Sequence, residues 1–253
     1  MQCVILAGGL GTRMRTLLGD QPKTLVPVLG QPFAAYQLDW LARQGITEVV
    51  YCLGHQGSAV RAFVGDGQDW QVSVTYVDEG DNLRGTAGAL RLAFDAGVLR
   101  PEFFVLYGDS FLRVELRRVN EAFARSGRRA LMVVLRNDNR WVPSNVVYDK
   151  ATVVLYNKNG VADRAGDMVY VDYGVSVLCR DLIGERIPAG VVADLSDVLR
   201  DLSREGGLAG FEATERFFEV GSPDGLRELE QHLGGAVPAT SAAAARACEG
   251  RDG

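Results

Sequence analysis

The sequence predicts an α/β fold: a doubly wound, mostly parallel mixed sheet flanked by helices on both faces. Strand-like apolar runs alternate with helical segments over the first 110 residues, and the first run, Cys3–Ala7, is continuously apolar, as in a strand buried on both faces. The 253 residues, with 47% apolar and 23% charged side chains, are typical of a globular protein. We expect a single domain over residues 1–234 and a disordered, Ala-rich tail over residues 235–253.

The first half of the chain predicts βαβ units around a parallel sheet. Leu38 and Leu41 share one face of a predicted helix, and Gly45 follows its end. After the first strand we expect strands at 48–53, 71–77 and 103–107 and helices at 33–44, 56–64 and 86–96. Ligands of such sheets bind beyond the carboxyl ends of the strands, which points to residues 8–23 and to Asp109.

The second half is less regular, and its last helix carries the plainest signals. Ser222 and Pro223 suit the N-cap and the first helical position, and Leu226, Leu229 and Leu233 form the apolar stripe that follows. Before it, we expect helices at 114–125 and 195–205, strands at 130–135, 168–178, 208–211 and 217–220, and a hairpin over 145–155 that turns at 148–150.

Charge and cysteine usage exclude several classes of function. The 27 Lys and Arg against 32 Asp and Glu give a net charge of −5, which argues against a nucleic-acid or anionic-membrane surface. The four cysteines show no CxxC spacing, and we interpret Cys3 and Cys52 as small buried hydrophobes. His55 and His232 are the only histidines, which argues against a His-rich metal site. No leader or long apolar segment is evident, so a cytoplasmic location is expected.

A glycine-rich loop follows the first strand. Gly8, Gly9 and Gly11 allow backbone amides to approach an anion closely, and Arg13 adds a guanidinium that matches phosphate oxygens. Lys23 is a second cation that can fold back to the same anion. A tight turn with a solvated arginine is the alternative interpretation.

Two other glycine-loop motifs fit poorly. A dinucleotide fingerprint needs a third glycine where Met14 stands, which argues against a nicotinamide oxidoreductase, and the Gly-Lys-Ser/Thr of a P-loop is absent.

The run Leu6-Ala7-Gly8-Gly9-Leu10-Gly11-Thr12-Arg13, with Pro22-Lys23 and Pro27-Val28 after it, resembles the signature of the sugar-1-phosphate nucleotidylyltransferases. The resemblance extends over most of residues 1–233. Further segments that are similar to the family's motifs are Glu79, Gly85-Thr86-Ala87-Gly88-Ala89, Gly108-Asp109, Lys158 and Phe218–Pro223.

The resemblance implies a Rossmann-like, GT-A-like fold and an enzyme that joins a nucleoside triphosphate to a sugar 1-phosphate and releases pyrophosphate. It implies that Arg13 and Lys23 are catalytic and that Asp109 and Glu219 hold Mg²⁺. The implied nucleotide-binding residues are Leu6, Ala7, Gly8, Gly9, Gly11, Thr12, Glu79, Gly85, Thr86 and Gly88. The implied sugar-phosphate-binding residues are Asp109, Lys158, Asp172 and Gly174. No nucleic-acid or membrane partner is expected, and a homo-oligomer stays open.

Several positions depart from the family pattern. Glu219 stands where the family usually has Asp, Asn157 precedes Lys158 where Glu is usual, and Asp172-Tyr173-Gly174 replaces Asn-Ala-Gly, which suggests a sugar with a different hydroxyl pattern. Taken alone, Asp109 also fits a helix N-cap and Lys158 a solvated turn residue.

Fewer residues bear on which nucleotide is used and on whether the protein is catalytic. The loop at 14–20 lacks the Pro-Leu-Thr of many uridylyl- and thymidylyltransferases and is more similar to heptose and mannose 1-phosphate guanylyltransferases, so we predict GTP before UTP, CTP or ATP. A non-catalytic regulatory relative is the alternative, and the presence of Arg13, Lys23 and Asp109 argues against it.

Overall fold

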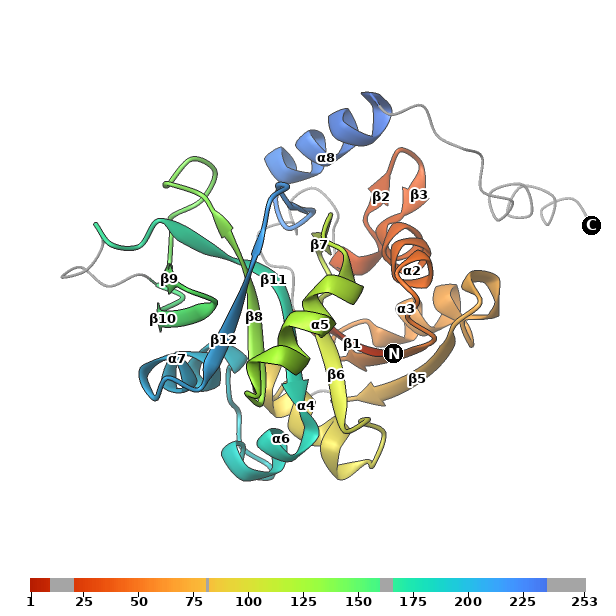
Figure 1. Cartoon of the computed structure of the whole chain (residues 1–253). Coiled ribbons are helices and arrows are strands. Elements are labelled where there is room, and N and C mark those ends of the chain that lie inside the picture. Colours follow the sequence, from red (N-terminus) through yellow and green to blue (C-terminus); the bar gives the residue numbers. More distant parts are fainter. Residues whose placement is uncertain (10–20, 81, 160–165, 236–253) are drawn as a thin grey trace, which may run out of the picture.

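The computed structural model describes residues 1–9, 21–80, 82–159 and 166–235. Its core is a mixed sheet with the strand order β5-β4-β1-β6-β11-β8-β12-β10-β9 (Figure 1). Followed from one edge to the other, the pairings give seven strands of one direction, with β11 and β10 running the opposite way. The mostly parallel mixed sheet predicted from the sequence is therefore confirmed.

The parallel half of the sheet comes from the first half of the chain. Its strands are β1 (Gln2–Ala7), β4 (Glu48–Leu53), β5 (Ser73–Asp78) and β6 (Glu102–Tyr107). All three pairings among them are parallel, so their carboxyl ends meet at one edge. Gly8 and Asp109 follow two of these ends, as the spacing predicts.

The other half of the sheet contains both directions. Its strands are β8 (Ala130–Arg136), β9 (Val146–Asp149), β10 (Thr152–Tyr156), β11 (Tyr170–Cys179) and β12 (Leu208–Ala213). The long strand β11 lies antiparallel between β6 and β8 and joins the two halves, while β9 and β10 form a hairpin at the edge.

Helices cover both faces of the sheet, as in a doubly wound fold. On one face, buried side chains of α2 (Phe33–Arg43), α3 (Gly57–Val64) and α5 (Leu116–Ser126) pack into one core. On the other face, α4 (Gly85–Asp95), α6 (Arg180–Arg186) and α7 (Leu195–Arg204) share a second core. Cys3 and Cys52 are buried in these cores, which confirms their interpretation as small hydrophobes, and burial raises the pKa of the Cys52 thiol to about 12.

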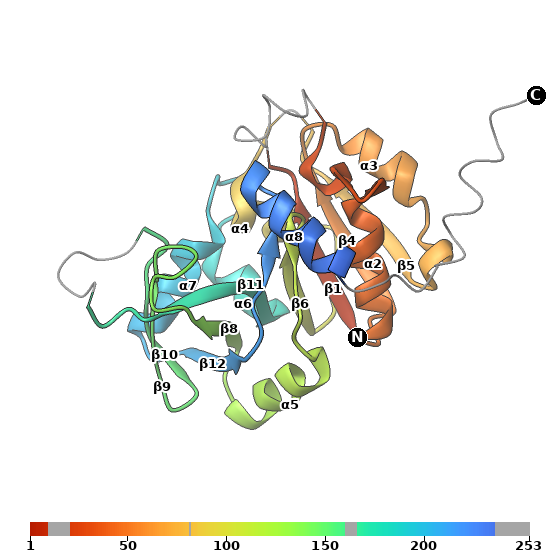
Figure 2. The ribbon, with the colours of Figure 1, turned by 90° about the horizontal axis from the view of Figure 1, so that it is seen from above.

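A third, smaller core anchors the last helix. The helix α8 (Pro223–Gly235) lies above the sheet in Figure 1 and over its central strands in Figure 2. Leu229 packs there with Val28 and Val220. The predicted N-cap is confirmed, because the Ser222 hydroxyl accepts a hydrogen bond from the Gly225 N–H at 3.1 Å.

The structure corrects several predictions. The hairpin turns at Lys150 and Ala151, which have φ of 44° and 63°, one position later than predicted. The interpretation of Asp109 as a helix N-cap is wrong, because the next helix, α5, begins after Glu115. Helix α6 was not predicted, because it follows β11 directly at Cys179 with no turn residue between them.

Three two-residue strands and two short helical turns are additions to the predicted elements: β2 (Pro27–Val28), β3 (Gln31–Pro32), β7 (Ser110–Phe111), η2 (Lys23–Leu25) and η3 (Gln68–Trp70). The strand expected at 217–220 is present as β13 (Phe218–Glu219) and is shorter than predicted. Elements this short carry no detectable hydrophobic period. Within the described ranges, no helix combines the length and the apolar character that a membrane span needs. The predicted tail and Gly11, Thr12 and Arg13 lie outside the described residues.

Candidate active site

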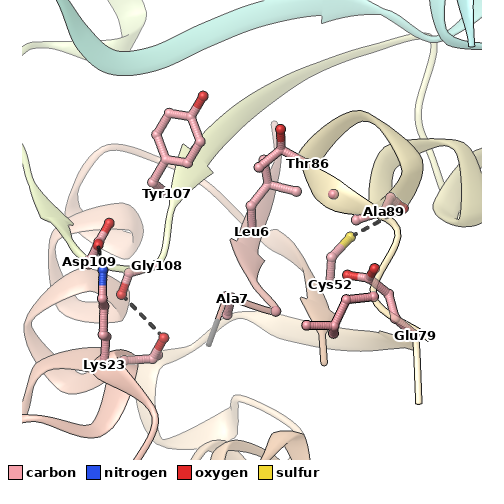
Figure 3. Close-up of a pocket in the computed structure, with 15 residues that line it drawn as sticks. Leu6, Ala7, Lys23, Cys52, Glu79, Thr86, Ala89, Tyr107, Gly108 and Asp109 are labelled. Atoms are coloured by element: carbon pink, nitrogen blue, oxygen red, sulfur yellow. Dashed lines mark hydrogen bonds and ion pairs between the residues drawn. The ribbon is translucent and has the colours of Figure 1, made fainter. Parts of the chain in front are cut away.

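A cavity of about 230 Å³ opens beyond the carboxyl ends of the parallel strands (Figure 3). It is lined by most of the nucleotide-side residues that the sequence singles out. These are Leu6, Ala7, Gly8, Gly9, Lys23, Glu79, Gly85, Thr86, Gly108 and Asp109. Lining residues that the sequence analysis did not assign to a site are Thr24, Cys52, Leu83, Ala89 and Tyr107. The edge of the sheet expected to bind a ligand therefore does carry a pocket.

One side of the cavity carries an ion pair. Lys23 Nζ lies 2.9 Å from Asp109 Oδ2, and only 20% and 24% of the two side chains are exposed. The turn η2 brings Lys23 there, because the neighbouring Thr24 hydroxyl donates to the Gly108 carbonyl at 3.2 Å. Gly221 packs against the pair: a Cβ at this position would lie 3.1 Å from Asp109 Oδ2 and 3.3 Å from Lys23 Nζ.

The opposite side of the cavity carries a nearly buried carboxylate. Figure 3 shows Lys23 and Asp109 on one side of the pocket and Glu79 on the other. The Arg84 N–H donates to Glu79 Oε2, while Glu79 Oε1 lies 2.7 Å from the place where a Cβ on Gly8 would stand. Burial raises the pKa of Glu79, and the hydrogen bond and charge of Arg84 oppose that rise. Gly8 therefore makes room for this carboxylate.

A second polar cluster lies beside the nucleotide-side cavity and contains Lys158, one of the predicted sugar-phosphate residues. Lys158 Nζ lies 2.8 Å from Asp194 Oδ2. Burial raises the pKa of Asp194, but hydrogen bonds from Lys158 and from the Ser196 N–H outweigh it and bring this pKa down to about 2. Asp194 also accepts a hydrogen bond from Thr86, which lines the cavity.

Asp172 occupies the strand β11 next to this cluster. Its carboxylate accepts hydrogen bonds from the Gly174 N–H at 3.0 Å and from the Tyr156 hydroxyl at 3.3 Å. Burial raises the pKa of Asp172, and these two hydrogen bonds and the charge of Lys158 oppose the rise. Gly174 has a φ of 91°, and a Cβ there would lie 3.2 Å from the Ser110 hydroxyl. Its backbone therefore turns at a position that favours glycine.

The charges of carboxylates from both clusters act on Tyr107, which lines the cavity. Burial raises the pKa of its hydroxyl well above the usual range, and nearby negative charges raise it further. These charges belong to Asp172, Asp194, Asp109 and Glu219. Both predicted metal ligands, Asp109 and Glu219, and the predicted sugar residue Asp172 are therefore near enough to Tyr107 for their charges to affect its pKa.

The donor set at Asp109 and Glu219 fits a hard divalent cation. In the small sheet of β7 and β13, Glu219 pairs with Ser110, and the Val220 N–H donates to the Asp109 carbonyl at 2.9 Å. Asp109 directly precedes β7 and Glu219 lies on β13, so the backbones of the two acids are close together. Among the described residues no cluster of three or more His, Cys, Asp or Glu side chains could hold a metal. Mg²⁺ commonly takes one or two carboxylates and completes its shell with water and substrate phosphates, so two acids suffice.

Two predicted nucleotide-binding glycines also have structural roles. Gly85 has a φ of 71°, and a Cβ there would stand 2.5 Å from the Ala193 carbonyl oxygen. Gly88 is not among the residues lining the cavity, and a Cβ there would stand 2.9 Å from the Val191 carbonyl oxygen. Both allow the loop before α7 to pack closely on the start of α4.

Sequence reasoning missed Asp194 and Tyr107. A signal for Asp194 was present, since it directly precedes the helical stripe that begins at Leu195, the position of an N-cap. Its contacts with Lys158 and Thr86 join residues 36 and 108 positions away. Tyr107 ends a strand that was predicted, but nothing in its pattern distinguishes it from a core aromatic residue.

Comparison with known proteins identifies the family. The family model described as "Nucleotidyl transferase" matches residues 2–141, more than half of the chain. The chain belongs to the nucleotidyl transferase family. This confirms the resemblance seen in the sequence and the expectation of an enzyme that transfers nucleotidyl groups.

Curated relatives of this nucleotidyltransferase differ in how much they share with it. It is 38% identical over 125 residues to the low-salt glycan biosynthesis nucleotidyltransferase Agl11 of Haloferax volcanii, a match that covers 49% of this chain and 34% of that one. It is 24% identical over 234 residues to the D-glycero-alpha-D-manno-heptose 1-phosphate guanylyltransferase of Aneurinibacillus thermoaerophilus, which covers 92% and 98% of the two chains. Other relatives are named as thymidylyl- and uridylyltransferases.

Solved structures agree on the fold. HddC from Yersinia pseudotuberculosis, solved as a complex with GMP-PN, superposes with a TM-score of 0.75 at 22% identity and covers 92% of this chain and 99% of that one. The Rossmann-like nucleotidyltransferase fold is thereby confirmed for this nucleotidyltransferase.

Proposed function

We propose that this nucleotidyltransferase joins GTP to a heptose or hexose 1-phosphate and releases pyrophosphate. The class of reaction is supported by a full-length relative, whose name describes guanylyl transfer to a heptose 1-phosphate. The observation that carries the proposal is the polarity of the cavity, with a buried carboxylate at Glu79 on one side and the Lys23–Asp109 pair on the other. A nucleotide that spans the cavity from one side to the other has its base at Glu79 and its phosphates at Lys23.

The carboxylate of Glu79 favours guanine over the other bases. Guanine presents two adjacent donors, N1–H and N2–H₂, and a carboxylate can accept both at once. Uracil presents one N–H flanked by two carbonyl oxygens, which a carboxylate repels. Glu79 Oε2 already accepts the Arg84 N–H, but each carboxylate oxygen has a second lone pair available.

The reaction needs positioning and charge neutralisation more than covalent help. An oxygen of the sugar phosphate attacks the α-phosphorus in line, a new P–O bond forms, and the bond between the α- and β-phosphates breaks with pyrophosphate leaving. In this scheme Lys23 offsets charge at the α-phosphate and on the leaving group. Arg13, which lies outside the described residues, keeps the same role on sequence grounds. Lys158 binds the phosphate of the sugar.

Asp109 and Glu219 are the residues proposed to hold Mg²⁺. Both carry oxygen donors, and the pairing of β13 with β7 brings Glu219 close to Asp109 along the backbone, which supports this role. When bound, the ion would neutralise phosphate charge and hold the triphosphate oxygens in place. Asp172, whose carboxylate lies next to Tyr156 and close to Lys158, is proposed to accept hydrogen bonds from sugar hydroxyls.

A panel of four nucleoside triphosphates against heptose and hexose 1-phosphates, with pyrophosphate counted and the product identified by mass, tests the proposal. We expect turnover with GTP, and we expect Arg13→Ala to lower it by about 10²-fold, the usual scale for one preorganised charge-stabilising donor. Arg43→Ala is the matched control, because Arg43 is an exposed residue of α2 that pairs with Asp39.

Each other outcome of the panel has a definite meaning. Turnover with UTP, CTP or ATP in place of GTP would refute the guanylyl assignment and leave the reaction class standing. Binding of nucleotide without pyrophosphate release from any pair would instead support a non-catalytic regulatory subunit.

A further inference from the structure

The Asp194 carboxylate connects segments that are far apart in the sequence. Its Oδ1 accepts hydrogen bonds from the Thr86 hydroxyl at 3.0 Å and from the Ser196 N–H at 2.9 Å. Its Oδ2 accepts from Lys158 Nζ at 2.8 Å. The Thr86 oxygen in turn accepts the Leu195 N–H at 2.7 Å. One carboxylate therefore links the turn after β10, the start of α4 and the start of α7.

We infer that Asp194 is a positioning residue of this nucleotidyltransferase, which holds the Lys158 ammonium at the sugar-phosphate side and ties it to Thr86 on the nucleotide side. The inference rests on the proposed function, which assigns Lys158 to the phosphate of the sugar.

The geometry separates this role from that of a helix cap. A cap for α7 needs only one acceptor oxygen, and Oδ1 provides it through the Ser196 N–H. Two hydrogen bonds to Oδ1 fix the carboxylate, so that Oδ2 faces Lys158. Lys158 needs such a partner, because its side chain is 57% exposed and ends a flexible stem in a turn.

Asp194 does not have to leave when a phosphate arrives. The lysine ammonium has three N–H donors, of which Asp194 uses one. The other two can donate to phosphate oxygens while the pair stays intact. Asp194 competes with the phosphate for the Lys158 ammonium, but only modestly, because the Asp194 side chain is 39% exposed. The gain from holding Lys158 in a fixed orientation is larger than this competition.

Asp194→Asn tests the inference, because asparagine caps helices about as well as aspartate but removes the charge that attracts Lys158. Isothermal titration with α-D-mannose 1-phosphate, without nucleotide or metal, gives the affinity directly. We expect the Kd to rise about tenfold, which corresponds to about 1.4 kcal/mol. In turnover assays the KM for the sugar phosphate should rise by a similar factor, while kcat and the KM for GTP stay within about threefold. Asp197→Asn in the same turn of α7, where Asp197 pairs with Arg200, should change none of these values.

A double-mutant cycle decides whether Asp194 acts through Lys158. Lys158→Ala and the double variant should show the same Kd for mannose 1-phosphate, because no ammonium is left to position. An unchanged or lower Kd in Asp194→Asn, or effects that multiply in the double variant, would overturn the inference. If wild type binds the probe but releases no pyrophosphate with any triphosphate, the proposed function fails and these Kd values still decide the role of Asp194. If wild type does not bind the probe, both fail.

Discussion

A methyl group at Gly8 tests the assignment of Glu79 to the nucleobase. In Gly8→Ala the new Cβ would stand 2.7 Å from Glu79 Oε1, whereas ordinary contacts begin near 3.4 Å. The carboxylate must therefore retreat by about 0.7 Å, while its other oxygen is held by the Arg84 N–H. This displacement moves Oε1 away from the position in which it would accept a hydrogen bond from the base. A hydrogen bond to a charged group contributes about 1.5–3 kcal/mol, so kcat/KM for GTP should fall about 10- to 150-fold.

Initial rates of pyrophosphate release at saturating sugar phosphate measure this loss. Gly234→Ala, at the far end of α8 with nothing within 4 Å of its added Cβ, is the control and should behave as wild type. Adding Glu79→Ala to Gly8→Ala should lower kcat/KM no further, since both changes remove the same contact. Wild-type kcat/KM for GTP in Gly8→Ala would refute the assignment of Glu79 to the base.

Three other perturbations have expected outcomes. Gly221→Ala should lower kcat about tenfold in steady-state assays, because its Cβ lies 3.1 and 3.3 Å from the two charged atoms of the ion pair on the phosphate side. Gly85 has a φ of 71°, and a Cβ there would lie 2.5 Å from a backbone oxygen, so Gly85→Ala should lower the free energy of unfolding in urea by about 3 kcal/mol or more. Gly97 has a similar φ of 69° but no atom within 4 Å of an added Cβ, so Gly97→Ala should lower it by only about 1 kcal/mol. The pKa of Asp194 is lowered to about 2, so its contribution is full above its unfolded value near pH 4 and is lost as the pH falls towards 2. Because its side chain is 39% exposed, we expect only about 1 kcal/mol, and Asp194→Asn should abolish this part of the acid dependence of the melting temperature.

The parallel half of the fold was predictable from the sequence because its signals are local. Buried parallel strands are continuously apolar, and β1 shows this with five of its six residues buried. Once the strand order alternates with helices, the carboxyl ends must share an edge, so the pocket near Gly8 and Asp109 follows from topology alone.

The rest of the site depends on contacts that no local pattern encodes. The β7–β13 pair brings Glu219 beside Ser110 over a separation of 109 residues, and it is only two residues long. Asp194 looks like an ordinary N-cap until the fold sets Lys158 and Thr86 against it. Local rules therefore predict the elements and the edge that carries the site, and tertiary pairing decides which side chains act together.

The balance of charge at the site bears on the role of a metal. The charges of four carboxylates raise the pKa of Tyr107, and Lys23 and Lys158 pair with two of them, Asp109 and Asp194. Both proposed substrates bring further negative charge. Because Lys23 and Lys158 already have acid partners, we expect binding of a triphosphate beside Asp109 and Glu219 to require an additional cation.

Nucleotide binding, measured by titration in the absence of any sugar phosphate, should therefore depend on Mg²⁺. We expect chelation by EDTA to weaken GTP binding at least tenfold in wild type. Asp109→Asn should show a smaller difference between the two conditions, because one of the charges that the ion offsets is gone. Asp138→Asn, a surface change at a residue that pairs with Arg136, should keep the full dependence. Equal GTP affinity with and without Mg²⁺ in wild type would mean that the cations of the chain, Arg13 among them, balance the phosphates alone and that Asp109 and Glu219 hold no ion.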